Sequence, residues 1–462
     1  MIEFSPITIY DKEHIESYTK HSKIRSCDLS FANMYCWQTL LQSAYAIVDG
    51  YLLIRFRISG GDKLGYMLPM SGDGEVDFGH IIPLLAQDAH SHGQRLHIIG
   101  LTHEGGERLK DSFSSQFALF NDLSNEDYIY LRESLCSLSG KKLQPKRNHI
   151  NQFRKLYPQF EYRELTPEMF DDCMVLDCRW RATHGTHCGG DTPEREAMQR
   201  AFDHFEQLGI CGGAIYIDGQ MAAFTYGSPI NDDTFCIHVE KGDNQITGCY
   251  TAINQLFAQS LPDTYRYINR EEDMGIEGLR RAKQSYYPDH KQEKQIAIHL
   301  HHDELECKKL WQSIFGDSDE FIDEFLIHHY SNHNMIRMAD RDNRYMAMLH
   351  AIPFTSEHGT VVYIYAVATA PEHRKRGYAA QLLQLAIERA QKSRAKAVVL
   401  IPSSDDLRRY YAKLGFSDGA MLTFKAYNNF DFGEENPEDN RSMIYPIEDD
   451  FPLEIETLHL TK

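Results

Sequence analysis

Residues 363–383 read YIYAVATAPEHRKRGYAAQLL, and this stretch decides the fold of the last third of the chain. An apolar run typical of a buried strand leads into Pro371, and residues Arg374 to Ala379 open a long amphipathic helix. Gly377 and Ala379 carry little or no side chain, so a ligand can approach the backbone closely. The turn between strand and helix is basic and contains Arg374, Lys375 and Arg376. Unpaired N–H groups of the first helical turn and these cations predict an anion-binding turn that suits a pyrophosphate. The alternative is a basic helix start exposed to water.

Segments on both sides of this stretch alternate between strand and helix patterns. The sequence predicts helices over 304–315, 319–331, 371–393 and 406–415, and strands over 335–340, 344–354, 361–369, 395–402 and 421–427. Residues 165–271 show the same order, with helices over 165–185 and 249–262 and strands within 212–242 and over 265–271. The first 135 residues are also mixed, with an Asp49-Gly50 hairpin signal inside 44–58.

This order predicts an α/β (α+β) protein of three units, each a mixed, largely antiparallel sheet flanked by helices. The units are expected at 1–150, 151–296 and 297–430. Residues 431–462 are rich in Asp and Glu and are expected to form an extended, partly ordered acidic tail.

Composition excludes several classes of protein. A length of 462 residues rules out a single small module, and a net charge of -19 repels nucleic acid and anionic membranes. The first residues lack the basic and apolar pattern of an export signal, and no run of about 18 apolar residues predicts a spanning helix. The ten cysteines form no C-x-x-C pair, which favours reduced thiols. We therefore expect a cytoplasmic protein.

No metal site is predicted. One group of cysteines and histidines matches no zinc spacing: Cys173, Cys178, His184, His187 and Cys188.

The anion-binding turn resembles the signature of the GNAT superfamily of acyl-CoA N-acyltransferases, R/Q-x-x-G-x-G/A. Arg374, Gly377 and Ala379 match it, and YYAKLGF follows at 410–416. The resemblance implies acetyl-CoA as acyl donor. The residues that it implies for binding this cofactor are Val367, Ala368, Thr369, Arg374, Lys375, Arg376, Gly377, Tyr378 and Ala379.

The same resemblance implies that Tyr411 protonates the leaving thiolate. A phenol with a pKa of about 10 is protonated at neutral pH and can act as a general acid. A packing role for Tyr411 is the alternative, and Tyr410 is its neighbour and competitor. Asp405 stands where the superfamily often has Asn.

The general base and the acceptor site are less defined. The strand before the turn carries no Glu, so His350 on a preceding strand is a candidate base, with a structural role as the alternative. The acidic segment 315–330 either holds a cationic amine or is a solvated helix face.

Residues 25–295 resemble the phosphatidylglycerol lysyltransferase C-terminal domain family. The matching segments are DLSFANMYCW (28–37), DYIYLRESLCSLSGKKLQPKRNHINQF (127–153), HVEKGD (238–243) and YINREEDMGIEGLRRAKQSYYP (267–288). The resemblance implies two tandem GNAT-like folds, in a family whose characterised members move an aminoacyl group from aminoacyl-tRNA to a lipid or peptide. TGCYTAINQL (247–256) stands in the place of the CoA turn without its basic residues.

One basic strip, residues 141–155, is a candidate tRNA contact or else a solvated linker. Three functions follow from these patterns. We expect N-acetyltransfer from acetyl-CoA to a small-molecule or peptide amine by the third unit. The alternatives are aminoacyl-tRNA-dependent transfer by the first two units, and a non-catalytic CoA-binding or recognition protein. The sequence does not specify the acceptor, the general base or the oligomeric state.

Overall fold

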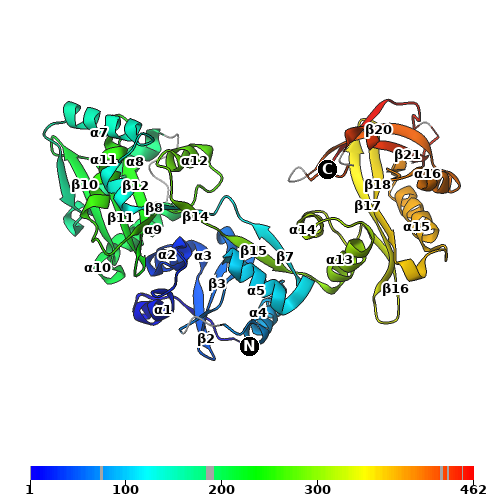
Figure 1. Ribbon diagram of the computed structural model, residues 1–462, viewed down its shortest axis with the longest axis horizontal. Coiled ribbons are helices and arrows are strands. Elements are labelled where there is room, and N and C mark those ends of the chain that lie inside the picture. Colours follow the sequence, from blue (N-terminus) through cyan, green and yellow to red (C-terminus); the bar gives the residue numbers. More distant parts are fainter. Residues whose placement is uncertain (1, 73–75, 184–191, 427–429, 434–435, 450) are drawn as a thin grey trace. The chain divides into compact units, whose positions relative to one another are not determined.

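The computed structural model describes residues 2–72, 76–183, 192–426, 430–433, 436–449 and 451–462. The chain forms two compact units, Met1–His299 and Leu300–Lys462. The described residues form three mixed sheets with helices against them (Figure 1). The predicted class, a mixed α/β fold with largely antiparallel sheets, is confirmed.

The first sheet of the Met1–His299 unit has the strand order β1-β2-β3-β4-β6-β15-β7, with β5 paired to β3. Its strands are β1 (Ser5–Pro6), β2 (Ala44–Val48), β3 (Tyr51–Arg57), β4 (Leu64–Met67), β5 (Met70–Ser71), β6 (His97–Leu101), β7 (Phe117–Asn121) and β15 (Gln295–His299). The helices of this part are α1 (Lys12–Thr19), α2 (Phe31–Cys36), α3 (Gln38–Leu41), α4 (Phe78–Ser91) and α5 (His103–Phe113).

The second sheet of this unit has the order β14-β8-β13-β12-β11-β10-β9. Its strands are β8 (Asp127–Leu131), β9 (Glu161–Glu164), β10 (Cys211–Ile217), β11 (Gln220–Asn231), β12 (Thr234–Gly242), β13 (Tyr267–Asn269) and β14 (His290–Gln292). The helices are α6 (Arg132–Ser137), α7 (Gln144–Leu156), α8 (Phe170–Thr183), α9 (Pro193–Asp203), α10 (Phe205–Leu208), α11 (Cys249–Ser260) and α12 (Glu277–Gln284).

The two sheets of this unit are built from interleaved segments of the sequence and share a hydrophobic core. The sequence placed the first unit boundary at residue 150, whereas β8 already pairs with β13 of the second sheet. The last strand, β15, returns to the first sheet and lies between β6 and β7. One apolar cluster joins both halves and includes Phe31, Leu52, Leu176 and Phe224. The difference arises because pairing between strands far apart in sequence decides which sheet a strand joins.

The sheet of the Leu300–Lys462 unit has the order β16-β17-β18-β19-β21-β20-β22. Its strands are β16 (Met335–Ala339), β17 (Tyr345–Ser356), β18 (Gly359–Thr369), β19 (Ala397–Leu400), β20 (Ser417–Lys425), β21 (Arg441–Pro446) and β22 (Thr457–Thr461). The helices are α13 (His302–Ile314), α14 (Asp319–His328), α15 (Tyr378–Lys392) and α16 (Asp405–Ala412).

Helices cover both faces of this third sheet (Figure 1). On one face Tyr365 of β18 contacts Trp311 of α13 and Phe325 of α14. On the other face Ile364 of β18 belongs to a core cluster that includes Leu382 of α15. The alternation along β18 therefore places successive side chains in different layers.

The acidic tail is part of the third sheet. The sequence placed residues 431–462 outside the folded units, but β21 lies between β19 and β20, and β22 pairs with β20. Met443, Ile444, Leu458 and Leu460 are buried. These strands are short, and the loops around them are rich in Asp and Glu. The average composition of the segment therefore did not reveal the apolar side chains of the strands.

The third sheet has a second parallel pair, β20 with β22, but in each sheet there is one parallel pair whose two strands are separated in the chain by a helix. The pairs are β4 with β6, β12 with β13, and β18 with β19, with α4, α11 and α15 between them. A parallel pair requires such a crossover connection. In the second and third sheets no described strand stands between the first strand of the pair and the helix, so these two sheets have comparable strand-to-helix turns, whereas β5 stands between β4 and α4 in the first sheet.

Eight cysteines in the described part of the chain are free thiols. Cys178 is disulfide-bonded, so the expectation of reduced thiols does not hold there. Within the described ranges, no helix is long and apolar enough to cross a membrane.

Candidate functional site

The turn before α15 has the open geometry that an anion requires. Gly377 caps the helix with a left-handed φ of 82°, and Lys375 is also left-handed at 62°. A Cβ at Gly377 would meet only the side chain of Gln381, 3.9 Å away. Arg374, Lys375 and Arg376 are exposed. The structure therefore brings the predicted residues Arg374 to Ala379 together at an accessible helix start.

The strand that leads into this turn is irregular. Tyr365 pairs with His350 and Ala368 with Met348, so β18 carries an extra residue between them, and Ala366 has a φ of 50°. The last parallel pair between β18 and β19 is Tyr363 with Val399. No other described strand pairs with this edge of β18, which continues to Thr369. Val367, Ala368 and Thr369 therefore belong to a part of β18 whose edge has no neighbouring strand among the described residues. Backbone groups along this edge can pair with a ligand.

Tyr411 lies against the helix that follows the turn. Its side chain belongs to the core cluster that contains Leu382 and Leu383 of α15. Burial raises the pKa of Tyr411 to about 12, so the phenol is protonated at neutral pH. The neighbouring Tyr410 is less buried. A protonated phenol is what the expected donor role requires, and its burial in this cluster also fits the packing alternative, so the role of Tyr411 stays a prediction.

His350 occupies the interior of the unit. It is fully buried, its Nε2 lies 3.5 Å from Cys307 Sγ, and its Nδ1 has no partner among the described residues. Burial lowers the pKa of His350 to about 3. A neutral imidazole next to the aromatic rings of Trp311 and Phe325 fits a structural role better than the role of an accessible general base.

Several acidic side chains of the segment 315–330 have structural partners. Asp317 accepts a hydrogen bond of 2.7 Å from Trp311, and Asp323 is ion-paired with the buried Lys308. Asp319 accepts from Gln312. Glu320 is exposed and has no such structural partner among the described residues. The structure thus supports a structural role for most of this segment.

The equivalent turn of the second sheet is closed. Gly248 caps α11 with a φ of 85°, as Gly377 caps α15. A Cβ at Gly248, however, would lie 2.8 Å from the His149 carbonyl oxygen and 3.0 Å from the Cβ of Phe153. Helix α7 therefore covers this turn, which also lacks basic side chains. An acyl-CoA pyrophosphate has no comparable place here.

Helix α7 also carries much of the basic strip, and two of its cations contact the rest of the protein. Lys146 Nζ lies 3.8 Å from the centre of the Tyr286 ring. Burial and the charge of Arg270 lower the pKa of Lys146 to about 8. Arg147 donates to the carbonyl groups of Leu138 and Gly140. The exposed cations are at the ends of the strip: Lys141, Lys142, Arg154 and Lys155.

A group of ionisable side chains, which we call the lysine cluster, joins the two halves of the Met1–His299 unit. It consists of Cys27, Asp28, Asp127, Glu272 and Lys294. Lys294 Nζ lies 2.9 Å from Asp28, 3.0 Å from Asp127 and 3.6 Å from Cys27 Sγ. Burial lowers the pKa of Lys294, but Asp127 and Asp28 outweigh it and raise that pKa well above the usual value. The lysine is therefore a fixed cation.

Glu272 is the carboxyl group of this cluster that forms no ion pair with a lysine or arginine in the described part of the chain. Its Oε2 lies 3.5 Å from Cys27 Sγ. Burial and the carboxylates of Glu271 and Asp127 raise the pKa of Glu272 to about 7. A carboxyl group with this pKa can exchange a proton near neutral pH.

A second group, which we call the histidine cluster, lies next to the first. Its members are Asn33, Cys236, His238, Glu271 and Ser228. His238 bonds through Nε2 to Ser228 at 2.7 Å and through Nδ1 to Glu271 at 2.9 Å. Glu271 has a left-handed φ of 56°. Burial raises the pKa of Glu271, but the hydrogen bond and charge of His238 outweigh it and hold that pKa below its ordinary value.

The family-like segments of the sequence contain many residues of the lysine and histidine clusters, but the sequence did not predict the clusters themselves. Segments 28–37, 127–153, 238–243 and 267–288 contain many of these residues, but Lys294 lies outside all of them. A usable signal is the polar run Asn269 to Asp273, which directly follows an apolar strand. Of the cysteine and histidine group considered for a metal, His184, His187 and Cys188 lie outside the described residues.

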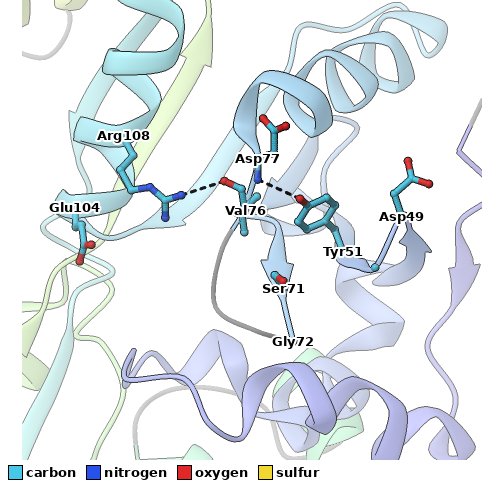
Figure 2. A pocket seen from close by; sticks show the side chains of 9 residues that line it. Asp49, Tyr51, Ser71, Gly72, Val76, Asp77, Glu104 and Arg108 are labelled. Atoms are coloured by element: carbon cyan, nitrogen blue, oxygen red, sulfur yellow. Dashed lines mark hydrogen bonds between the residues drawn. The ribbon is translucent and has the colours of Figure 1, made fainter.

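A cavity of about 740 Å³ opens elsewhere on the first sheet. Figure 2 shows Asp49, Asp77, Glu104 and Arg108 around it. Arg108 donates to the Val76 carbonyl group at 3.0 Å, and the Asp77 N–H donates to Tyr51 at 3.2 Å (Figure 2). No site residue predicted from the sequence lines this cavity.

Comparison with protein-family models identifies two regions. Residues 19–298 match "Phosphatidylglycerol lysyltransferase, C-terminal", and residues 298–416 match "Acetyltransferase (GNAT) family". Both resemblances seen in the sequence motifs are confirmed. No curated protein matches the chain.

Solved structures give further matches. A conserved protein of unknown function from Bacteroides thetaiotaomicron is 40% identical with a TM-score of 0.62, over 65% of this chain and 100% of that one. L-PGS from Bacillus licheniformis is 14% identical with a TM-score of 0.47, over 65% and 94% of the two chains. A GNAT family N-acetyltransferase from Escherichia coli in complex with CoA is 14% identical with a TM-score of 0.26, over 35% and 86%.

Proposed function

Because the chain belongs to the phosphatidylglycerol lysyltransferase C-terminal family and carries a GNAT acetyltransferase domain after it, we propose that it is an acyl-CoA-dependent N-acyltransferase. The Leu300–Lys462 unit is the catalytic part, and acetyl-CoA is the donor. The acceptor is a small-molecule or peptide amine. The two sheets of the Met1–His299 unit form two further units of the same general kind.

The observation that carries this proposal is the open turn at Gly377. Its left-handed φ and free Cβ position leave the N–H groups of the first turn of α15 accessible to a pyrophosphate. The closed turn at Gly248 in the same chain provides the contrast. Arg374, Lys375 and Arg376 add charge-assisted contacts. Val367, Ala368 and Thr369 offer the edge of β18 to the arm of the cofactor.

The proposed reaction is direct transfer. The nitrogen of a neutral amine attacks the thioester carbonyl carbon, the C–N bond forms, and the C–S bond breaks. The departing thiolate takes a proton from Tyr411, whose phenol is protonated at neutral pH. The amine proton passes to water. Tyr411 then regains a proton from solvent.

The test uses the full chain, because a fragment that ends at residue 430 would lack β21 from the middle of the sheet. Acetyl-CoA is incubated with a panel of amines, and free thiol and acetylated products are measured. We expect thiol release that depends on an added amine. Saturable binding of acetyl-CoA without release would contradict catalysis and favour a recognition protein.

A second candidate is aminoacyl transfer by the Met1–His299 unit. The lysine and histidine clusters favour it, because they place acid-base groups beside each other in the region matched by the lysyltransferase family model. The internal contacts of Lys146 and Arg147 leave fewer cations for a tRNA. We therefore expect the full chain to bind charged tRNA no better than an acidic control protein.

Gel-shift titrations with charged tRNA at two salt concentrations test this second candidate. A submicromolar complex that weakens steeply with salt, and that is lost on charge reversal of Lys141, Arg154 and Lys155, would contradict our expectation. It would move the main chemistry to the Met1–His299 unit.

A further inference from the structure

The histidine cluster contains three donors of the types that bind zinc. Cys236 and His238 lie on β12, and Glu271 follows β13. The two strands are parallel, and Cys236 pairs with Asn269, so two residues further on His238 comes beside Glu271. One ligand atom from each of Cys236, His238 and Glu271 lies within 4.8 Å of the others. Strand pairing therefore gathers a thiol, an imidazole and a carboxylate at one point.

The distances between the donors fit one ion of tetrahedral geometry. Glu271 Oε1 lies 2.9 Å from His238 Nδ1 and 3.7 Å from Cys236 Sγ. Zinc bonds of about 2.1 Å to N or O and 2.3 Å to S, at tetrahedral angles, separate N from O by about 3.4 Å and S from O by about 3.6 Å. The separation of His238 Nδ1 from Glu271 Oε1 would have to open by about 0.5 Å to accommodate the ion, whereas the separation of Glu271 Oε1 from Cys236 Sγ already fits.

Neighbouring side chains hold two of the donors in place. His238 Nε2 bonds to Ser228, whose hydroxyl group also lies 3.0 Å from that of Ser30. Ser228 is only 2% exposed, so it is placed to orient the imidazole and not to meet a substrate. Asn33 donates to Glu271 at 2.9 Å. Such outer contacts accompany metal-binding histidines and carboxylates in proteins.

A bulge in β12 aims the imidazole. Tyr226 of β11 pairs with Val239, and Gly227 pairs with Ile237, which leaves His238 as an extra residue. Bulges of this kind redirect a side chain and are frequent next to active sites. The backbone of Glu271 is also in a sparsely populated conformation, with its φ of 56°. Two local irregularities thus converge on the same pair of donors.

The lysine cluster shows what an internally neutralised site looks like. Cys27, Asp127 and Glu272 are also within reach of one ion, but Lys294 already lies within 3.6 Å of Cys27 and 3.0 Å of Asp127. Its ammonium group occupies the place of a cation. Glu271, in contrast, has no ion pair with any lysine or arginine of the described residues. Lys283 also lowers the pKa of Glu271 through its charge, but its ammonium group donates to the carbonyl groups of Arg270 and Glu272 and does not pair with the Glu271 carboxylate.

We propose that Cys236, His238 and Glu271 bind one zinc ion or a similar borderline transition-metal ion. Three protein ligands leave a fourth position for water or substrate, which is the pattern of a catalytic and not a structural zinc site. The thiolate favours such ions over magnesium or calcium, which prefer oxygen. This site is independent of the acyl-CoA turn and differs from the sequence-based expectation of no metal.

The test titrates zinc into the full chain after chelator treatment and dialysis, with a chromophoric chelator as competitor. We expect one zinc ion per chain with a micromolar or tighter Kd. Cobalt(II) in place of zinc should give the absorption bands of a tetrahedral ion with a thiolate ligand. Cys236→Ser, His238→Gln and Glu271→Gln should each weaken zinc binding at least 100-fold.

Two further variants separate a ligand from a merely nearby group. Ser228→Ala should weaken binding roughly 10-fold to 100-fold, as expected when an orienting partner is lost. Cys249→Ser, which removes another buried thiol of the same sheet region, should leave binding unchanged. Circular dichroism reports whether each variant is folded. The three ligand substitutions differ in chemistry, so zinc binding by those variants that fold is sufficient to test the site.

An absence of binding, or equal binding in the folded ligand variants and Cys249→Ser, would overturn the proposal. A millimolar, nonstoichiometric association would count against it in the same way, because a built site with three donors binds far more tightly.

Discussion

The ammonium group of Lys294 lies 3.0 Å from a carboxylate oxygen of Asp127, and both side chains are buried. Lys294 directly precedes β15 of the first sheet, and Asp127 is the first residue of β8 in the second sheet. Asp127 also accepts the backbone N–H of Cys27 at 2.7 Å. Asp127 therefore connects three segments from distant parts of the sequence, through one ion pair and one hydrogen bond.

Lys294→Met should destabilise the Met1–His299 unit by about 3 kcal/mol or more, because it leaves a buried carboxylate without its cation. Hydrogen exchange of the β8 and β15 amides measures this opening free energy. Lys291→Met is the matched control, since Lys291 pairs with Glu126 but has a side chain that is 31% exposed. Its cost should be below about 1 kcal/mol. Equal costs would show that the buried pair has no special weight.

Gly377→Asp should abolish the stabilisation that acetyl-CoA gives to the chain, because it places a carboxylate against the phosphates. In the unchanged protein a ligand at 100 times its Kd should stabilise by about 2.7 kcal/mol, which appears as a higher Tm. Gly316→Asp is the control, with a φ of 78° and an equally open Cβ position in the same unit. The same loss of the Tm shift in both variants would contradict the assignment of the turn.

Tyr411→Phe should lower kcat about 100-fold with little change in CoA affinity, because only the proton donor is removed. Steady-state assays and a CoA titration check both quantities. Tyr410→Phe should have little effect. A reversed pattern would move the donor to Tyr410, and no effect in either variant would mean that solvent protonates the thiolate.

Acid should destabilise the Leu300–Lys462 unit through His350. The imidazole takes up a proton below about pH 6.5 in the unfolded chain but only near pH 3 in the folded one, because burial and the charge of Lys462 lower its pKa. Stability is therefore full above pH 6.5 and falls as the pH drops, by about 3 kcal/mol between pH 7 and pH 4. Calorimetry should show a weaker pH dependence in His350→Met.

The exposed His333 supplies the control for this pH effect. His333→Gln should retain the full pH dependence of the unchanged protein. The other groups near His350 are Cys307 and Tyr330, together with Trp311 and Phe325, which do not titrate. The same slope in His350→Met as in the unchanged chain would assign the acid sensitivity elsewhere.

Local patterns predicted local structure well. Asp49 and Gly50 both have positive φ, as the hairpin signal requires, and they join β2 to β3. Helix α11 begins at Cys249 as expected. Helix α15 begins at Tyr378, later than the expected 371, because Pro371–His373 forms a separate 3₁₀ turn and Gly377 is left-handed. In these cases the deciding residues are neighbours in the sequence.

Long-range features were not predictable in the same way. The lysine cluster draws on Cys27, Asp127, Glu272 and Lys294, which only strand pairing brings together. The anion-binding turn could be recognised because its residues are contiguous. Whether a turn is open depends on packing: Gly377 and Gly248 have almost the same φ, and the position of α7 closes the turn at Gly248.

The position of β15 between β6 and β7 also determines when the first sheet can be completed during synthesis. During synthesis, residues up to Asn121 leave the ribosome long before Gln295–His299 exists. Until then the edges of β6 and β7 that β15 will join have no partner, and such edges invite pairing with other chains. The first sheet closes only after the second sheet has been translated. The two halves are therefore a single unit of biosynthesis, and a truncation near residue 150 would release an incomplete sheet.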